Sequence, residues 1–214
     1  MNVHDFPDDA VARAVPYGIY DPVANRGWVY VGTSCETPAF AVDAIERWWV
    51  QAGRTLYPAA ERILIVADSG GANGCRVRLW KERLQRQLAD EHGLAVTVAH
   101  YPTGCSKWNP VEHRLFGPIS RNWAGIPLRS LETMLALIRG TCSKAGLVVE
   151  AELLEGTYPT GRRVSDKLMR WLDLAPGAVC PRWNYTLRPR PLSDPADTPG
   201  IQMLTPWDLE ALVS

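Results

Sequence analysis

Two short β-prone runs open the patterned part of the chain. Residues 17–21 and 28–33 are rich in aromatic and β-branched side chains, and the segment between them contains Asn25 and Gly27. Because Asn and Gly favour tight turns, we predict an antiparallel hairpin here. From residue 38 the apolar positions follow helical spacing, which predicts a helix that ends at Gly53.

A continuous apolar run follows at residues 62–68 and ends in Asp68. Its length and lack of alternation predict a central strand that is covered on both faces. The glycine-rich segment 69–74 then leads into a predicted helix that reaches about His92, and residues 94–101 are predicted as another buried strand. Strand, helix and strand in this order predict a parallel crossover.

The second half of the chain is predicted to be mainly helical. Asn109 as cap and Pro110 at the first helical position are typical of a helix start. A second helix is predicted after Pro127, where leucines and Ile138 share one stripe. The other expected elements are a strand at residues 147–154 and a short helix from Ser165 to Leu172.

Length and composition indicate one packed domain with a tail. The chain has 214 residues, of which 46% are hydrophobic and 21% charged, as in ordinary globular proteins. We expect a domain at residues 1–190, followed by a Pro- and Asp-rich tail at 191–214 in which Thr205 begins a possible short helix. Because the formal net charge is zero, nucleic-acid binding would need a local basic surface.

The sequence also bears on the cellular compartment. The N-terminal residues lack the basic start and apolar stretch of a secretory signal, and the longest strongly apolar run, residues 63–67, is too short to span a membrane. The five cysteines show no paired spacing, which favours reduced thiols. We therefore expect a cytoplasmic protein that makes no membrane contact.

Two acids are the main candidates for chemistry. Asp68 ends a predicted strand, and Glu112 starts a helix after the next strand, so this layout can bring both carboxylates to one sheet edge. Carboxylate oxygens are ligands that Mg²⁺ prefers, and paired metal ions serve phosphoryl transfer. Each acid also has an ordinary structural interpretation, as a turn residue for Asp68 and as part of a helix cap for Glu112.

Several short motifs make the prediction more specific. They are Val-His-Asp-Phe at 3–6, Pro-Tyr-Gly-Ile-Tyr-Asp at 16–21, Ala-Asp-Ser-Gly-Gly-Ala-Asn-Gly at 67–74, Ser-Lys-Trp-Asn-Pro-Val-Glu-His-Arg-Leu-Phe at 106–116 and Trp-Asn-Tyr-Thr-Leu-Arg-Pro at 183–189. Together these motifs resemble the ISAzo-type insertion-sequence transposases over residues 2–190.

The resemblance implies a fold and a catalytic triad. The expected fold is ribonuclease-H-like α/β, a mixed sheet flanked by helices, with an Asp-Asp-Glu triad in which Asp68 is the second acid and Glu112 the third. In such proteins the first acid lies on a mid-sheet strand that precedes the hairpin. That strand would come before Asn2, so we expect this chain to be truncated and to lack both. Asp5 and Asp21 are the nearest other acids, and both are predicted to be turn or loop residues.

The resemblance also implies a reaction and partners. We expect two Mg²⁺ or Mn²⁺ ions, transposon-end and target DNA as substrates, strand cleavage followed by strand transfer, a possible homo-oligomer, and a nucleoid-associated protein of the bacterial cytoplasm. The alternative is a catalytically inactive remnant that retains at most DNA or partner binding. A third hypothesis takes residues 69–74 as a nucleotide phosphate loop, but the full nucleotide-binding fingerprints are absent.

Basic and aromatic residues near the two acids are the candidates for DNA contacts. A solvated helix face is the alternative for those on the helix after residue 74, and core packing is the alternative for the tryptophan. A second basic and aromatic stretch lies at residues 182–190. It either contacts nucleic acid, or its aromatic residues pin the tail to the core. The predicted DNA-binding residues are Arg76, Arg78, Lys81, Lys107, Trp108 and Arg114.

Overall fold

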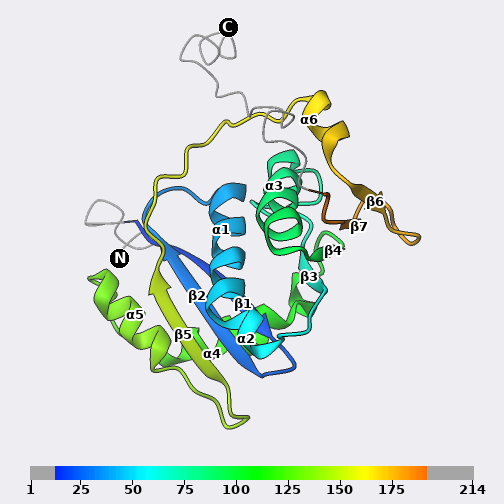
Figure 1. The fold of residues 1–214 in the computed structure, drawn as a ribbon. Coiled ribbons are helices and arrows are strands. Elements are labelled where there is room, and N and C mark those ends of the chain that lie inside the picture. Colours follow the sequence, from blue (N-terminus) through cyan, green and yellow to red (C-terminus); the bar gives the residue numbers. More distant parts are fainter. Residues whose placement is uncertain (1–12, 192–214) are drawn as a thin grey trace, which may run out of the picture. The chain divides into compact units, whose positions relative to one another are not determined.

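The computed structural model describes residues 13–191, which divide into two compact units (Figure 1). Unit 1 comprises the described residues up to Glu36 together with Gly104–Tyr158. Unit 2 comprises Thr37–Thr103 and the described residues from Pro159 onward. Asp5 and the helix start predicted at Thr205 lie outside the described residues.

Unit 1 contains a three-stranded mixed sheet in the order β1-β2-β5. Strands β1 (Val15–Asp21) and β2 (Arg26–Gly32) form the predicted antiparallel hairpin. Strand β5 (Val148–Leu153) confirms the strand predicted at 147–154, and it pairs with β2 in parallel. Parallel pairing needs a long connection, and the helices of unit 1 lie within it.

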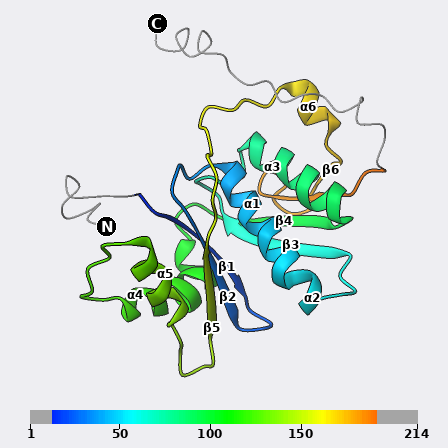
Figure 2. The same ribbon diagram turned by 60° about the vertical axis from the view of Figure 1, so that its left-hand side comes forward.

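The helices of unit 1 build the core on one face of this sheet (Figure 2). A short 3-10 turn, η4 (Ser106–Trp108), precedes a π-helical turn, η5 (Val111–Phe116), which continues into α4 (Gly117–Asn122). The helix predicted after Pro127 begins later, as α5 (Leu131–Arg139), because Ser130 caps it by accepting from the Thr133 amide. Buried core residues include Val29, Val31, Leu115, Ile119, Met134, Ile138 and Val149.

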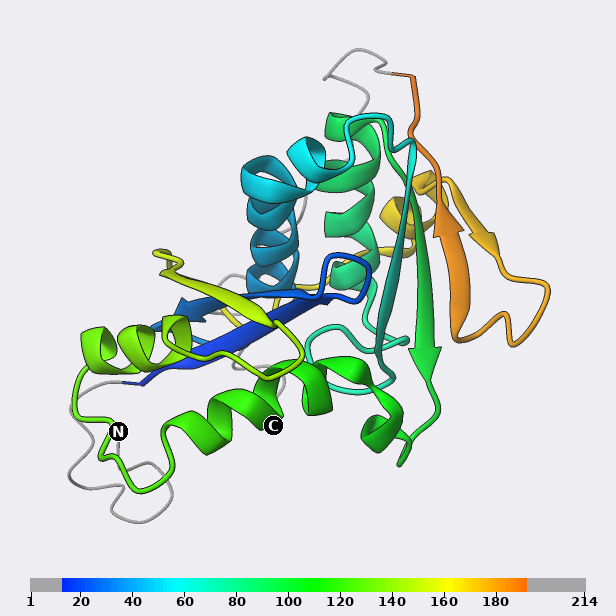
Figure 3. The same cartoon turned by 90° about the horizontal axis from the view of Figure 1, so that it is seen from below.

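Unit 2 contains a four-stranded mixed sheet in the order β3-β4-β7-β6 (Figure 3). Strands β3 (Arg62–Asp68) and β4 (Ala95–Tyr101) are parallel, which confirms the predicted crossover. Strand β7 (Asn184–Leu187) pairs antiparallel with both β4 and β6 (Leu174–Pro176). The sequence pattern predicts neither of these two strands, because each is only three or four residues long and because β7 pairs with β4, which is distant in sequence.

The prediction that residues 62–68 form a central strand is wrong for this sheet. Strand β3 lies at its edge, and Leu64 and Val66 are 63% and 44% exposed. The apolar run fits a buried strand equally well at any position in a sheet, so the sequence does not distinguish an edge from the centre. The expected single sheet is likewise replaced, over residues 13–191, by two mixed sheets, one in each unit.

Three helical segments accompany the sheet of unit 2. The first runs from α1 (Pro38–Trp48) through the π-helical turn η2 (Trp49–Gly53) to the short α2 (Arg54–Leu56), and the predicted end at Gly53 falls within it. The second packs beside α1 and consists of α3 (Arg78–Leu84) and the π-helical turn η3 (Gln85–Asp90). The third is α6 (Asp166–Trp171), whose predicted cap is confirmed because the Ser165 hydroxyl accepts from the Leu168 amide.

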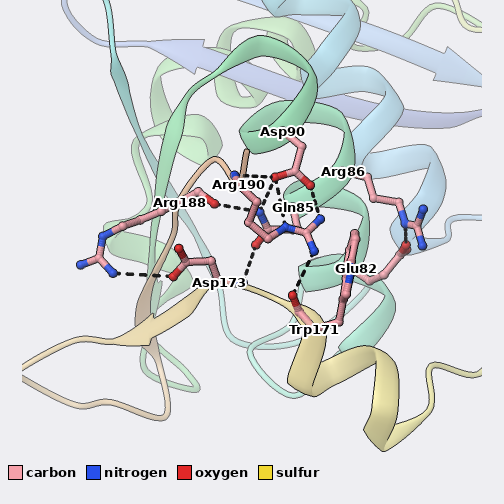
Figure 4. A network of polar contacts seen from close by, with 8 residues as sticks. All are labelled: Glu82, Gln85, Arg86, Asp90, Trp171, Asp173, Arg188 and Arg190. Atoms are coloured by element: carbon pink, nitrogen blue, oxygen red, sulfur yellow. Dashed lines mark hydrogen bonds and ion pairs between the residues drawn. The ribbon is translucent and has the colours of Figure 1, made fainter. Parts of the chain in front are cut away.

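A polar network fastens the end of the described chain to unit 2 (Figure 4). Gln85, which is fully buried, donates to Asp90 and to the Arg188 carbonyl and accepts from the Asp173 amide. Arg190 donates to Asp90 and to the Trp171 carbonyl. The network joins η3, α6 and the residues that follow β7, so residues up to Arg190 belong to the packed part of unit 2.

Candidate functional site

Asp68 is the last residue of β3, where a parallel strand delivers side chains to the loops at its carboxyl end. Its side chain is partly exposed. The next residue, Ser69, shares a 3.3 Å hydrogen bond with Thr103, which follows β4. The ends of the two parallel strands are therefore tied together directly beside Asp68.

The loop after Asp68 is compact, because main-chain hydrogen bonds within it and a contact with His100 hold it in place. The Gly74 amide donates to the Gly71 carbonyl and the Cys75 amide to the Ser69 carbonyl, each at 3.2 Å. A Cβ atom on Gly74 would lie 3.0 Å from the Ser69 carbonyl oxygen, so only glycine fits this turn without a backbone shift. The buried His100 ring lies 2.9 Å from the carbonyl oxygen of Asn73. This compact loop is followed by a helix that begins at Arg78.

Glu112 lies at the start of the helical segment η5 and is exposed. The Asn109 side chain accepts from the Val111 amide, as predicted for a cap, and the Asn109 carbonyl accepts from the Glu112 amide. The segment is a π-helical turn rather than the expected α-helix, a local widening that is frequent at functional sites. The His113 ring contacts the Lys107 carbonyl and so ties η4 to this turn.

Glycines of the hairpin fix the position of the Glu112 helix within unit 1. A Cβ atom on Gly27 would lie 2.3 Å from Leu115, and one on Gly18 would lie 2.6 Å from Phe116. Leu115 is fully buried, so it cannot move aside at little cost. The side chains that directly follow Glu112 along the chain therefore hold the helix against the hairpin.

The two candidate acids belong to different units, Asp68 to unit 2 and Glu112 to unit 1. Among residues 13–191, no group of three or more His, Cys, Asp or Glu side chains is placed to hold a metal ion. Asp21 is a turn acid, as expected, because its carboxylate accepts from the amides of Val23 and Ala24. Asp68 is therefore carried by a strand end of unit 2, and Glu112 by a helical turn of unit 1.

The predicted basic residues on and before α3 differ in their surroundings. Arg76 is exposed. Arg78 forms a 2.6 Å ion pair with Asp166 and also donates to the Val164 carbonyl. Burial lowers the pKa of Lys81, whose Nζ lies 5.0 Å from the centroid of the Tyr185 ring. Two of these three cations are therefore engaged within unit 2.

The residues beside Glu112 are more available to a ligand. Trp108 is 68% exposed, and the Lys107 Nζ lies 5.4 Å from its ring centroid. Lys107 and Arg114 are exposed, and no described carboxylate forms an ion pair with either. The core-packing alternative for Trp108 is wrong. An exposed indole beside the Lys107 ammonium group is a suitable surface for nucleic acid.

The sequence pattern did not single out Arg121 and gave no role to His100. Arg121 on α4 is exposed, and its Nη1 would lie 3.7 Å from a Cβ atom on Gly117, so its guanidinium covers the helix one turn after Arg114. The seven-residue spacing of the two arginines was a visible signal. His100 gave no such signal, because its importance comes from main-chain carbonyls that only folding places around it.

The second basic and aromatic stretch is mainly structural. Tyr185 lies on β7 and is 1% exposed, and its hydroxyl accepts from the Trp80 indole at 2.9 Å. Arg190 is engaged in the polar network, whereas Arg182 is exposed. For Tyr185, the interpretation that the aromatic side chain packs into the core is therefore confirmed.

These features define a mixed α/β protein with one acid at the end of a parallel strand and another at a helix start beside a basic surface. The family model described as the Rhodopirellula transposase DDE domain matches residues 1–189. The chain belongs to this family of DDE-domain transposases, which confirms its resemblance to the ISAzo type. No curated protein and no solved structure matches the chain.

Membership of the family supports a transposase function and DNA as the substrate. DDE transposase domains generally use divalent metal ions. Within the described residues, no helix is both long and apolar enough to cross a membrane.

Proposed function

We propose that this chain acts in DNA transposition through metal-dependent strand cleavage and strand transfer, with Asp68 and Glu112 as the second and third acids of a DDE triad. The family match over residues 1–189 is the observation that carries this proposal. A ribonuclease-H-like fold is part of it. The free edges of β1 in one sheet and of β3 in the other, within the described residues, are compatible with an additional strand.

The donor chemistry fits hard divalent ions in part. Asp68 and Glu112 supply carboxylate oxygens, the ligands that Mg²⁺ and Mn²⁺ prefer, but among the described residues no group of three or more His, Cys, Asp or Glu side chains is placed to hold a metal ion. When bound, the ions would stabilise charge on the attacking and leaving oxygens of a phosphodiester. The role proposed for the chain's own acids is to hold these ions, with Asp68 carried by a strand end and Glu112 by a packed helix.

DNA contacts are proposed for the predicted basic residues in two groups. Lys107, Trp108 and Arg114 are exposed near Glu112, and Arg76 is exposed on the loop before α3. These residues can approach phosphates or bases without breaking an ion pair to any described residue. Arg78 and Lys81 are proposed as weaker contacts, since their cations already interact with Asp166 and Tyr185.

A catalytically inactive transposase domain that retains DNA binding is the second candidate. The observation that favours it is the exposed surface at Lys107, Trp108 and Arg114, which needs no metal ion to bind nucleic acid. The two candidates share the DNA surface and differ only in the metal-dependent step.

Metal binding and cleavage can be measured separately. Mn²⁺ affinity would be determined by electron paramagnetic resonance for the full chain and for Asp68→Asn and Glu112→Gln, with Asp166→Asn as the control. We expect each of the first two substitutions to weaken Mn²⁺ binding about tenfold or more, because each removes one charged ligand. The control should have no effect.

Cleavage would be followed as nicking of supercoiled plasmid with Mg²⁺ or Mn²⁺. Nicking that both acid substitutions abolish supports the catalytic proposal. DNA binding without nicking or Mn²⁺ binding supports the inactive domain, and nicking that survives both substitutions contradicts the roles of Asp68 and Glu112.

A further inference from the structure

His100 has an unusual pair of neighbours. It lies near the end of β4 and is 6% exposed. Its Nδ1 lies 2.7 Å from the carbonyl oxygen of Trp183, and its Nε2 lies 2.9 Å from the carbonyl oxygen of Asn73. A carbonyl oxygen can only accept a hydrogen bond, and a neutral imidazole carries only one N–H. Both contacts are hydrogen bonds only if the ring carries two protons.

A neutral ring with one proton would leave one of the two contacts repulsive. In either neutral tautomer, one ring nitrogen would direct its lone pair at a carbonyl oxygen, and the ring is only 6% exposed. Doubly protonated, the ring donates two charge-assisted hydrogen bonds, which are stronger than neutral ones. The Tyr185 ring, 5.9 Å away between centroids, adds a favourable aromatic neighbour.

The other ionisable groups near this ring do not neutralise it. The Lys81 ammonium group of α3 lies over the ring of Tyr185, the aromatic neighbour of His100. Cys75 is a buried thiol in the loop before α3. Asp68 ends the adjacent strand, but His100 pairs in register with Ala67. Because side chains alternate along a strand, Asp68 faces the opposite side of the sheet from Ala67 and His100. The two carbonyls are thus the direct partners of the imidazole.

The two carbonyls belong to segments that are far apart in sequence. Asn73 lies in the coiled loop that follows Asp68, and Trp183 directly precedes β7. The Trp183 carbonyl also accepts from the main-chain amide of His100 at 3.2 Å, so both the main chain and the ring of His100 contact this carbonyl. On the other side, the Nε2 contact links the loop to the sheet through a side chain. Losing it would remove this anchor of the loop while leaving the strand pairing intact.

We propose that His100 is an imidazolium in the folded protein and is the positioning residue that holds the loop after Asp68. Its Nε2 fixes the loop through Asn73, and its Nδ1 fixes the ring through Trp183. The protonation state and the anchoring of the loop are independent of any activity. Only the consequence for the Asp68 carboxylate rests on the proposed function.

A matched pair of substitutions separates the two ring nitrogens. The amide nitrogen of asparagine replaces Nδ1, so His100→Asn keeps the contact with Trp183 and loses the one with Asn73. The amide nitrogen of glutamine replaces Nε2, so His100→Gln keeps the contact with Asn73. Both variants are neutral and of similar size, so a purely structural role in core packing would affect them equally.

The first measurement is ¹⁵N NMR of the imidazole nitrogens in the full chain at neutral pH, with His100 assigned by comparison with the two variants. Two protonated nitrogens are expected, and one unprotonated nitrogen would overturn the proposal. The second measurement is native-state amide exchange at Gly74 and Cys75. We expect exchange about tenfold faster in His100→Asn than in His100→Gln, because only His100→Asn loses the hydrogen bond to the Asn73 carbonyl. Equal exchange rates in the two variants would refute the anchoring role.

Mn²⁺ affinity provides the link to function. If Asp68 is a metal ligand, His100→Asn should weaken Mn²⁺ binding more than His100→Gln does. If the wild-type chain does not bind Mn²⁺, the proposed function fails, whereas the proton count and the exchange rates still decide the role of His100.

Discussion

Arg190 encloses the Asp90 carboxylate, donating to it from both its main-chain amide and its guanidinium group. The same guanidinium donates to the Trp171 carbonyl and covers the Trp171 ring, over which Arg86 also lies, at 4.9 Å from the ring centroid (Figure 4). The two side chains of the ion pair are only 18% and 12% exposed. A partly buried charge pair of this kind becomes costly once one partner is removed.

We predict that Arg190→Gln lowers the free energy of unfolding by about 3 kcal/mol, because Asp90 would keep a buried charge without its partner. Chemical denaturation measures this change. The matched control is Arg188→Gln, because Arg188 pairs with Asp173 at 3.8 Å in an exposed position. Its effect should stay below about 1 kcal/mol. Equal effects of the two substitutions would contradict the importance of the buried pair.

The contact between Gly27 and Leu115 should be equally measurable. Gly27→Ala would place its methyl group against a fully buried side chain, and we expect a loss of about 1–3 kcal/mol in the free energy of unfolding. Gly70→Ala is the control, because no atom lies within 4 Å of its added Cβ. Combining Gly27→Ala with Leu115→Ala should cost less than the sum of the single changes, and strict additivity would argue against the clash.

Stability should depend on the ionisation of Glu46. Burial, and then the nearby Glu91 carboxylate, raises the pKa of Glu46 above its ordinary value of 4.5. The folded state therefore binds this proton more readily than the unfolded state, so the stabilising contribution is complete below pH 4.5 and is lost as the pH rises through the folded-state pKa. We expect Glu46→Gln to be more stable than the wild type at pH 7 and to lose that advantage in acid.

Glu132 provides a control of opposite sign. Hydrogen bonds from its own main-chain amide and from Ser130 lower the pKa of its carboxyl. The charged form is therefore favoured in the folded state, and the contribution is lost as the pH falls. Glu132→Gln should be less stable than the wild type at pH 7, with the difference disappearing in acid. Denaturation curves between pH 7 and acid measure the free energy of unfolding of both variants. A change of the same sign in Glu46→Gln and Glu132→Gln, relative to the wild type at pH 7, would contradict the opposite pKa shifts.

Binding to DNA should depend on Lys107 and Arg114 more than on Arg78. Each cation that neutralises a phosphate of duplex DNA contributes about 0.9 to the slope of log affinity against log salt. Lys107→Gln and Arg114→Gln should each reduce the slope by up to this amount. Arg78→Gln should leave it nearly unchanged, because Asp166 already pairs with that guanidinium. Fluorescence anisotropy with a short duplex, repeated at several salt concentrations, measures all three slopes.

The sequence by itself determined most of the local structure and the family. The hairpin around Asn25 and Gly27, the helix cap at Ser165 and the parallel crossover that begins after Asp68 all follow from local pattern, and all are observed. Residues 1–189 match the family that the motifs indicated, because the residues of a motif can be read from the sequence without a structure. Turn residues, caps and hydrophobic periodicity act over a few residues, which makes them visible without a structure.

Only the tertiary structure decided which strands are neighbours and which charges are engaged. It placed β3 at a sheet edge, added β7 beside β4, paired Arg78 with Asp166, and set His100 between the carbonyls of Asn73 and Trp183. In each case the partner lies far away along the chain. No local pattern encodes such a partner, because hydrogen bonds and ion pairs between distant segments form only after the backbone has brought them within a few ångströms.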